Sequence, residues 1–186
     1  ALGCNPEDVF VASTGVTGQP LPIDLIKAGI RQIALSTEGG HEMARAIMTT
    51  DTVPKETAVV VRAGDTEFTI GGIAKGSGMI HPNMATMFGF LTADAAVELA
   101  FLRSVLRRVA DVSFNMISVD GDTSPSDTVL LMANGLAKNK VISVVSPLAE
   151  AFERALTQIC LYLAKAIARD GEGATRLIEV TVQGAA

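Results

Sequence analysis

Thr86 lies in an unusual stretch, KGSGMIHPNMATMFGF at residues 75–90, which combines a lysine and a glycine run with a threonine among methionines. A threonine hydroxyl is a weak nucleophile at neutral pH and needs a base close by. Its own α-amine, with a pKa of about 8, can serve, but only after the peptide bond to Ala85 is cut. In a precursor, the same hydroxyl could attack the Ala85 carbonyl, because the GSG run permits strained backbone geometry. The stretch therefore indicates either a self-cleaving nucleophile at Thr86 or an ordinary strand threonine.

A second candidate site lies in VFVASTGVTGQ at residues 9–19. The pattern predicts a strand over 8–13, a glycine-rich loop, and a helix over 23–29 that Pro20 and Pro22 open. A strand, glycine loop and helix in this order are also typical of dinucleotide-binding domains. The two prolines crowd that loop, however, and no acidic residue follows a second strand where ribose binding would need it. The sequence GGIAKGSG at 71–78 has its lysine in the wrong place for a phosphate-binding loop.

Carboxylates gather in DGDTSPSD at residues 120–127. Their spacing suggests a calcium loop, but the sixth position lacks glycine and Leu131 occupies the twelfth, where a glutamate is needed. Asp120, Asp122 and Asp127 are instead expected to shape a turn through hydrogen bonds from backbone amides to their side chains. No metal site is predicted.

The bulk properties limit the class of protein. Among 186 residues, 48% are apolar and 19% charged, with a net charge of −5, and no apolar run approaches the roughly 18 residues of a membrane helix. Basic residues are scattered, so neither a nucleic acid nor a membrane is expected as a partner. Cys4 and Cys160 lack metal-binding spacing, and a soluble protein of the reducing cytoplasm is expected. Since residue 1 is alanine, the chain looks processed or excerpted, so the missing signal peptide adds little to the expectation of a cytoplasmic location.

The elements that must position these residues form a mixed α/β pattern. Gly64-Asp65 predicts a hairpin between strands 58–63 and 67–73. Apolar residues at helical spacing predict helices over 94–110 and 152–167, each expected to cover a sheet, and a short helix is expected over 42–48. Further segments rich in β-branched residues are predicted as strands: 115–119, 128–133, 141–145 and 177–182.

The stretch K-G-S-G-M-I-x-P-N-M-A-T-M closely resembles the self-cleavage segment of the ornithine acetyltransferase family, the bifunctional glutamate N-acetyltransferases of arginine biosynthesis. Further segments resemble the same family in the same order, so that the match spans nearly all 186 residues: VASTGVTGQPLP at 11–22, MTTDTVPK at 48–55, SVDGDTSPSDTVLLMANG at 118–135 and RDGEGATRLIEVTV at 169–182.

The resemblance implies a single catalytic core over 1–186 that cuts itself between Ala85 and Thr86 into pieces 1–85 and 86–186. Thr86 would then take acetyl from N-acetylornithine and pass it to glutamate through an ester, without a cofactor. Some members also accept acetyl-coenzyme A as donor. The family's fold is α/β, with stacked mixed β-sheets and helices outside, and its two kinds of piece assemble into heterotetramers or higher oligomers.

The resemblance also implies site residues. Thr14 and Gly15 match the pair that stabilises the oxyanion. Lys75 matches the active-site lysine, which could bind a substrate carboxylate or lower the pKa of the nearby α-amine. Glu172 matches the ligand of the substrate α-ammonium, and Thr49 matches a further substrate contact. Without the resemblance, Thr14 and Gly15 fit a plain strand-to-helix turn, and Lys75 fits a solvated lysine. Glu172 then fits a charged residue in the loop that ends a helix, and Thr49 fits an ordinary loop threonine.

Three departures from the family pattern stand out. Pro125-Ser126 replaces an expected threonine-asparagine pair, which alters a turn, and His81 stands where alanine is common. Family members are also longer, with an additional N-terminal segment and a C-terminal part that contributes an asparagine and a hydroxyl residue to the substrate pocket. The chain is therefore expected to be either an excerpt or a truncated, non-catalytic module of the same fold.

Overall fold

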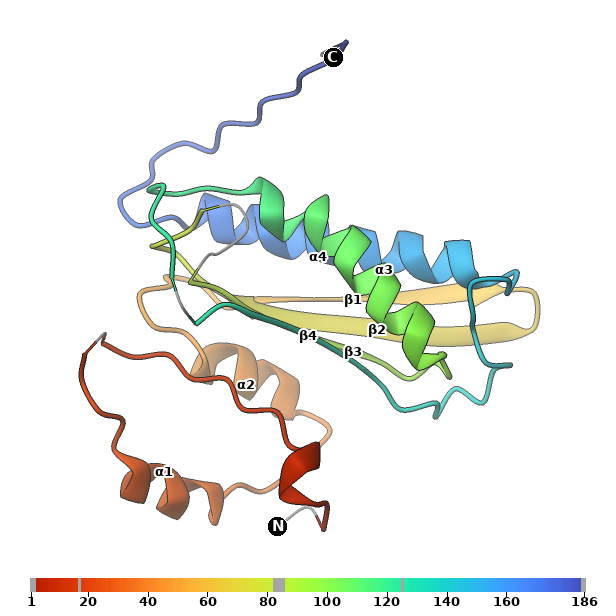
Figure 1. Ribbon diagram of the computed structural model, residues 1–186, viewed down its shortest axis with the longest axis horizontal. Helices are drawn as coiled ribbons and strands as arrows, with labels where there is room; N and C mark the ends of the chain where they lie inside the picture. Colours follow the sequence, from red (N-terminus) through yellow and green to blue (C-terminus); the bar gives the residue numbers. More distant parts are fainter. Residues whose placement is uncertain (1–2, 17, 82–85, 125, 185–186) are drawn as a thin grey trace.

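One four-stranded mixed sheet forms the centre of the molecule (Figure 1). The computed structural model describes residues 3–16, 18–81, 86–124 and 126–184. The strands follow chain order across the sheet: β1 (Lys55–Ala63), β2 (Thr66–Lys75), β3 (Phe88–Ala93) and β4 (Thr128–Ala133). β2 is antiparallel to both neighbours, whereas β3 and β4 run parallel. The start of β3, the start of β4 and the end of β2 therefore meet at one end of the sheet.

The predicted hairpin is confirmed, and its strands are longer than expected. β1 and β2 pair from Lys55↔Ala74 to Ala63↔Thr66. Gly64 occupies the first turn position with φ +60°, a conformation that glycine adopts without steric cost. The predicted strand over 128–133 coincides with β4.

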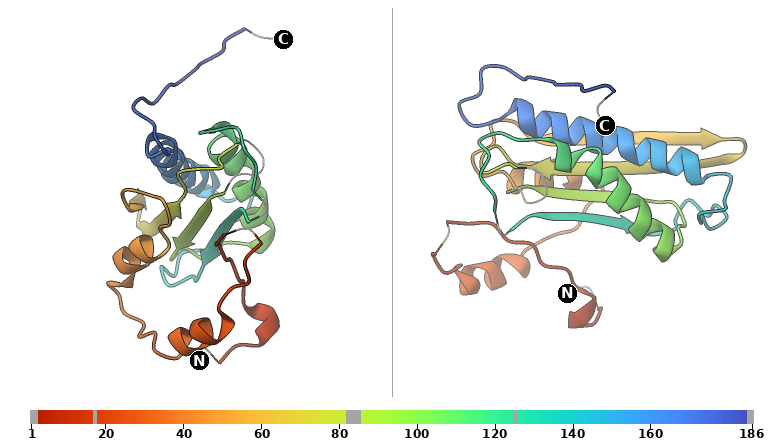
Figure 2. Two further views of the ribbon diagram at one scale, coloured as in Figure 1. Left: turned by 90° about the vertical axis from the view of Figure 1, so that its left-hand side faces the viewer. Right: turned by 45° about the horizontal axis from the view of Figure 1, so that its top comes forward.

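Helices α3 (Leu99–Asp111) and α4 (Ala149–Arg169) pack side by side on the same face of this sheet (Figure 2). Both predicted helices are confirmed, although α3 begins later than expected. Apolar residues at helical spacing form their buried stripes, with Phe101, Val105 and Val109 on α3 and Phe152, Leu156, Ile159, Leu163 and Ile167 on α4. The Phe152 ring lies 5.9 Å from that of Phe68 in β2. The expectation that each helix covers a sheet is confirmed, and both helices cover the same face of the same sheet.

The opposite face of the sheet carries α2 (Gly39–Ala46), which contacts β1 and β2. α1 (Ile23–Ile30) follows Pro22, as predicted, but buries none of its residues. A 3-10 turn, η1 (Pro6–Asp8), begins the described part of the chain. Among the described residues, no helix combines the length and the apolar character that crossing a membrane requires. The α/β class with helices outside a mixed sheet is confirmed.

Several segments predicted as strands do not pair in the described parts of the chain. Residues 9–13 are irregular, with Phe10 80% and Val11 84% exposed. Residues 114–116 form a 3-10 turn, η2 (Phe114–Met116), and Ile142 makes only a single bridge to Val97. Residues 177–182 are extended and exposed. β-branched composition favours a strand only where a partner edge is present. The described residues therefore form one sheet, without the expected second sheet stacked upon it.

Gly72 of β2 lets α4 approach the sheet closely. A Cβ added there would lie 2.7 Å from Leu91 Cδ2 and 3.0 Å from Ile159 Cγ2, and both side chains are fully buried. Gly72→Ala is therefore expected to lower the free energy of unfolding by about 1–3 kcal/mol, because the core must shift to admit a methyl group. Urea denaturation measures this change.

Gly71→Ala is the matched control for this substitution. A Cβ at Gly71 meets no atom closer than 3.7 Å, the distance to Thr92 Oγ1. We expect this neighbouring substitution to leave the urea midpoint close to that of the unchanged chain. Equal midpoints for the two variants would contradict the packing argument.

Candidate active site

Three candidate residues lie at the end of the sheet where β2 stops and where β3 and β4 start. Lys75, the last residue of β2, pairs with Phe88, the first residue of β3. Phe88 is in register with Thr128, the first residue of β4. Thr86 lies two residues before the start of β3, and Asp127 lies immediately before the start of β4. The sheet topology therefore brings Lys75 and Thr86, from the two ends of one strand connection, together with Asp127 from a later part of the sequence.

Lys75 is buried, with 1% of its surface exposed. Its Nζ donates to Thr14 Oγ1 at 3.4 Å and lies 5.1 Å from the centroid of the Phe88 ring. Burial lowers the pKa of Lys75, while the charges of Asp51 and Asp127 oppose that change. The solvated-lysine interpretation is therefore wrong, and two residues that the family resemblance singled out, Thr14 and Lys75, are in contact.

Thr86 is held through its backbone, whereas its hydroxyl is buried. Its N–H donates to the Met79 carbonyl at 2.7 Å. Its Oγ1 is buried and has no hydrogen-bond partner among the residues that the structure describes. Thr86 lies just before β3 rather than inside a strand, which removes the ordinary-strand interpretation. Ala85 lies outside the described residues, so cleavage between Ala85 and Thr86 remains a prediction.

The glycine run after Lys75 brings the backbone close to Thr86. Gly76 has φ +147°, and an added Cβ would lie 3.2 Å from the Thr86 carbonyl oxygen and 3.3 Å from Met87 Cβ. Any larger residue would therefore be strained by its conformation and would push against the Thr86 backbone. Met79, three residues further on, also has a positive φ of 54°, which is uncommon for a residue with a side chain. This loop stores backbone strain next to the predicted nucleophile.

Glu172 lies beside the same loop, although it comes from the segment after α4. Its N–H donates to the Ser77 carbonyl at 2.7 Å, and its carboxylate lies so close to Gly78 that a Cβ there would be 2.7 Å from Cδ. Ser77 Oγ in turn shares a hydrogen bond of 2.7 Å with Thr50 Oγ1. Glu172, a predicted substrate ligand, is thus carried by a segment that contacts the glycine run. The same holds for the predicted ligand Thr49, because its neighbour Thr50 bonds to Ser77.

Thr49 and Gly15 are the least constrained of the predicted site residues. Thr49 is exposed, and its N–H donates to Asp51 Oδ2 at 3.1 Å. Gly15 is exposed in an irregular segment, and an added Cβ there would lie 3.3 Å from Leu21 Cδ2. The position of Gly15 next to Thr14 keeps it near Lys75. Its role in binding an oxyanion remains a prediction.

A buried charge cluster, Asp51–Lys55–Asp170, supports this site and was missed in the sequence. Lys55 Nζ donates to Asp51 Oδ1 and to Asp170 Oδ2, both at 2.6 Å. Asp51 Oδ1 also accepts the Gly76 N–H at 2.7 Å, and Asp170 accepts both the N–H and the hydroxyl of Thr52. The cluster ties together the 49–52 loop, the start of β1, the glycine run and the end of α4.

The electrostatics of the cluster favour its charged form. Burial raises the pKa of Asp51, but hydrogen bonds from Gly76 and Lys55 outweigh this effect, so that the pKa lies below its ordinary value. The pKa of Asp170 is lowered in the same way, against burial, by Lys55 and Thr52. The four-residue spacing of Asp51 and Lys55 is visible in MTTDTVPK, but no sequence pattern links Lys55 to Asp170, which is 115 residues away.

The turn-shaping role predicted for the DGDTSPSD carboxylates is confirmed for Asp120, whose Oδ1 accepts the Asp122 N–H at 3.1 Å, and both Asp120 and Asp127 also bind backbone amides of other segments. Asp120 accepts the N–H groups of Met79 at 2.6 Å and Ile80 at 3.1 Å. Asp127 Oδ1 accepts the Met87 N–H at 3.0 Å. Asp127 Oδ2, by contrast, is buried without a hydrogen-bond partner in the described part of the chain. Burial raises the pKa of Asp127 to about 6, although the Met87 amide and the charge of Lys75 partly oppose this.

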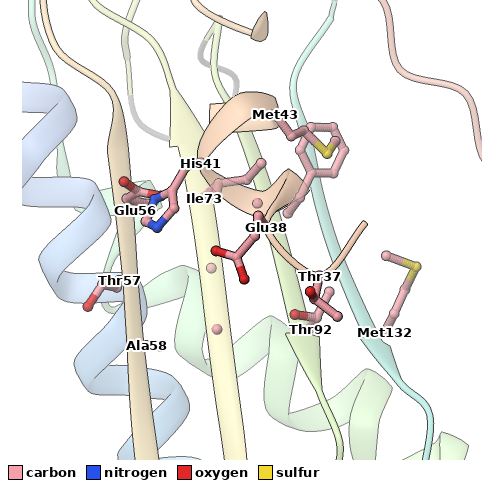
Figure 3. A pocket seen from close by; sticks show the side chains of 14 residues that line it. Thr37, Glu38, His41, Met43, Glu56, Thr57, Ala58, Ile73, Thr92 and Met132 are labelled. Carbon is pink, nitrogen blue, oxygen red and sulfur yellow. The ribbon is translucent and has the colours of Figure 1, made fainter. Parts of the chain in front are cut away.

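A cavity of about 560 Å³ lies elsewhere, between α2 and the sheet face opposite α4 (Figure 3). Its lining includes His41 of α2, which shares a hydrogen bond of 2.7 Å with Glu56 of β1. The other lining side chains are mainly apolar or small, with Met43, Ile73 and Met132 among them. None of the predicted site residues lines this cavity. Residues 9–16 form no strand ahead of α1, so the strand, loop and helix pattern assumed for nucleotide binding does not form here.

The chain matches known proteins along its whole length. The family model described as the ArgJ family matches residues 1–186. The chain is 61% identical over 188 residues to the arginine biosynthesis bifunctional protein ArgJ of Symbiobacterium thermophilum, covering 100% of this chain and 47% of that protein. It is 56% identical over 186 residues to the protein of the same name from Dehalococcoides mccartyi, covering 100% and 46%. The chain spans about half the length of the curated relatives it matches.

A solved structure also matches part of the chain. The crystal structure of the arginine biosynthesis bifunctional protein ArgJ from Bacillus halodurans is 45% identical, with a TM-score of 0.45. The match covers 48% of this chain and 41% of that one.

Proposed function

The chain belongs to the ArgJ family, and from that premise we propose that it carries the nucleophile of an acetyltransferase of arginine biosynthesis. Its similar relatives are named arginine biosynthesis bifunctional proteins. In this proposal, the chain cuts itself between Ala85 and Thr86, and the new terminus at Thr86 moves acetyl from N-acetylornithine to glutamate. Acetyl-coenzyme A is an alternative donor, and neither a metal nor a bound cofactor takes part.

The proposed chemistry is a two-step acyl transfer. The Thr86 α-amine takes the hydroxyl proton while Oγ1 attacks the acetyl carbonyl, and ornithine leaves with that proton. The acetyl ester conserves the acyl bond until the glutamate amine attacks it and reverses these steps. Each step passes through a tetrahedral oxyanion, for which the Thr14 hydroxyl and the Gly15 N–H would be the donors.

The observation that carries this proposal is the contact of Lys75 Nζ with Thr14 Oγ1 at 3.4 Å, at the sheet end where Thr86 lies. Thr14 and Lys75 are 61 residues apart, and no local element explains why they meet. A buried cation next to the Thr86 terminus would favour the free-base form of its α-amine, because like charges repel. A free α-amine is the form that can act as the base.

The proposed substrates also fit the charges around the site. N-acetylornithine and glutamate each present a carboxylate, for which Lys75 is the partner. Glutamate as acceptor and ornithine as product carry an α-amine, for which the Glu172 carboxylate beside Gly78 is the partner. Thr49 would provide a further hydroxyl contact from the 49–52 loop.

The two proposed pieces would remain joined after cleavage. β2 of the first piece pairs with β3 of the second over Ile70↔Ala93 to Lys75↔Phe88, and α4 packs on β1 and β2. This shared sheet and core make pieces 1–85 and 86–186 one folding unit. Assembly of such pairs into a heterotetramer or higher oligomer, and a location in the cytoplasm, form part of the same proposal.

Mass spectrometry and N-terminal sequencing of the purified protein test this function. We expect a piece that starts Thr-Met-Phe-Gly, and we expect it to gain the mass of one acetyl group when N-acetylornithine is added. Glutamate should then remove that acetyl group and yield N-acetylglutamate. A single uncut species that never becomes acetylated would contradict the proposal and favour a non-catalytic module.

A further inference from the structure

Asp127 has an unexplained free oxygen at the candidate site. Its Oδ1 is fixed by the Met87 amide at 3.0 Å, while its buried Oδ2 lacks a hydrogen-bond partner among the described residues. The buried side-chain oxygens and nitrogens of the described chain include just one other such atom, Thr86 Oγ1. An unpaired buried polar atom costs roughly 1–3 kcal/mol, so two of them at one site call for an explanation.

The two residues that carry these oxygens, Thr86 and Asp127, lie on backbone segments that are hydrogen-bonded to each other. The amide that binds Asp127 Oδ1 is the N–H of the Thr86–Met87 peptide itself. The Thr128 N–H donates back to the Met87 carbonyl at 3.1 Å, which locks the start of β4 against the start of β3. The Asp127 carboxylate is therefore held against the Thr86–Met87 peptide, while Asp127 Oδ2 and Thr86 Oγ1 are not hydrogen-bonded to each other.

Self-cleavage needs a proton acceptor that the mature enzyme does not need. Before the cut, the Thr86 nitrogen is an amide and cannot act as a base, so another group must take the hydroxyl proton. Asp51 and Asp170 are both engaged by Lys55, and Glu172 is exposed beside Gly78. Asp127 is the carboxylate that combines burial, a free oxygen and direct contact with the Thr86–Met87 peptide.

We propose that the Asp127 carboxylate accepts the Thr86 hydroxyl proton during self-cleavage, an inference that rests on the proposed function. Thr86 Oγ1 forms a bond to the Ala85 carbonyl carbon, and the proton moves to Asp127 Oδ2. The bond from that carbon to the Thr86 nitrogen then breaks, and Asp127 returns the proton to the departing amine. Water hydrolyses the resulting ester, which leaves a carboxylate on Ala85 and restores the Thr86 hydroxyl.

The surroundings suit Asp127 to this role. A base works best when its pKa lies near the working pH, and burial raises the pKa of Asp127 to about 6. The charged group that acts on it is Lys75 from β2, which is itself faced by Asp51 and Lys55. Lys75 keeps the carboxylate ionised at neutral pH, while burial keeps it more basic than an ordinary aspartate.

Pulse-chase translation of the protein in a cell-free system tests the proposal, with the uncut and cut chains separated by mass. We expect the cleavage rate of the wild type to rise with pH and to level off above about pH 6, as Asp127 loses its proton. Asp127→Asn retains the shape and the acceptor for the Met87 amide. It should slow cleavage by about 100-fold or more and abolish the step near that pH.

Asp120→Asn is the matched control, because Asp120 also accepts backbone amides in this turn but through Met79 and Ile80. Whatever its rate, this variant should keep the pH step of the wild type. If Asp127→Asn fails to fold, Asp127→Ala with added formate provides a second test, since formate should accelerate cleavage.

Three outcomes would overturn the assignment of Asp127. The first is a wild-type cleavage rate that shows no step near pH 6. The second is an Asp127→Asn variant that is cut at a rate within about threefold of the wild type. The third is a folded Asp127→Ala variant whose cleavage formate does not accelerate. A wild type that is never cut would instead refute the proposed function itself, so the two failures are distinguishable.

Discussion

Replacing Thr86 with alanine is expected to abolish both the cutting of the chain and the transfer of acetyl. Alanine lacks the hydroxyl that attacks in each reaction, and no neighbouring side chain can supply one from the same backbone position. Thr86→Ser should retain part of both activities, because a hydroxyl and, after cleavage, an α-amine are still present. Mass spectrometry of the purified variants measures cutting, and formation of N-acetylglutamate measures transfer.

Thr92→Ala is the control for this pair of variants. Thr92 belongs to β3, six residues after Thr86, and lines the cavity between α2 and the sheet. Its loss should leave both reactions unchanged. Cutting of Thr86→Ala at the wild-type position would show that Thr86 is not the nucleophile of self-cleavage.

Lys55→Met is expected to cause the largest loss of stability among single substitutions at the site. Lys55 is 2% exposed and neutralises both Asp51 and Asp170 at 2.6 Å. Methionine fills a similar volume but leaves two buried carboxylates without a cation, which costs about 3–5 kcal/mol. Urea denaturation at neutral pH should reveal this loss.

The stability that Lys55→Met loses should become smaller as the pH falls, and this direction follows from the lowered pKa values of Asp51 and Asp170. A carboxylate with a lowered pKa stabilises the fold above its unfolded pKa of about 4, and this contribution disappears as the pH falls through the folded value. In the variant, the two carboxylates instead favour protonation. The wild type and Lys55→Met should therefore differ most at neutral pH and converge below about pH 4.

Arg154→Met provides the comparison for a removed cation. Arg154 pairs with Glu150 at 2.6 Å, but the two side chains are 70% and 79% exposed. Such surface pairs contribute about 0–1 kcal/mol. A loss in Lys55→Met no greater than that in Arg154→Met would contradict the view that the buried cluster holds the site together.

The parts of the fold with local signals were predictable from the sequence. The 3.6-residue periodicity of apolar positions located α4 and most of α3, and Gly64 located the hairpin. The strands over 8–13, 115–119 and 177–182 were wrong for a shared physical reason. β-branched composition reports a preference, whereas a strand exists only when a partner edge supplies hydrogen bonds, and no local pattern encodes that edge.

The site divides in a similar way. Family motifs identified Lys75, Thr14, Thr86 and Glu172, and the structure brings segments bearing all four to one end of the sheet. The burial of Lys75 could not be predicted, because it depends on Phe88 and Thr14 arriving from other parts of the chain. The role of Asp170 depends in the same way on Lys55, a residue far away in the sequence.

The antiparallel pairing of β2 with β3 has a consequence for how the protein is made. The predicted cut lies in the connection between these two strands, so cleavage there would turn one chain into two pieces that share one ladder of hydrogen bonds. The uncut polypeptide finds this pairing by closing a short loop, whereas the cut pieces must meet by diffusion and lose translational freedom. A protein cut at this position is therefore expected to refold after denaturation only by association of two separate pieces, so its refolding should depend on protein concentration.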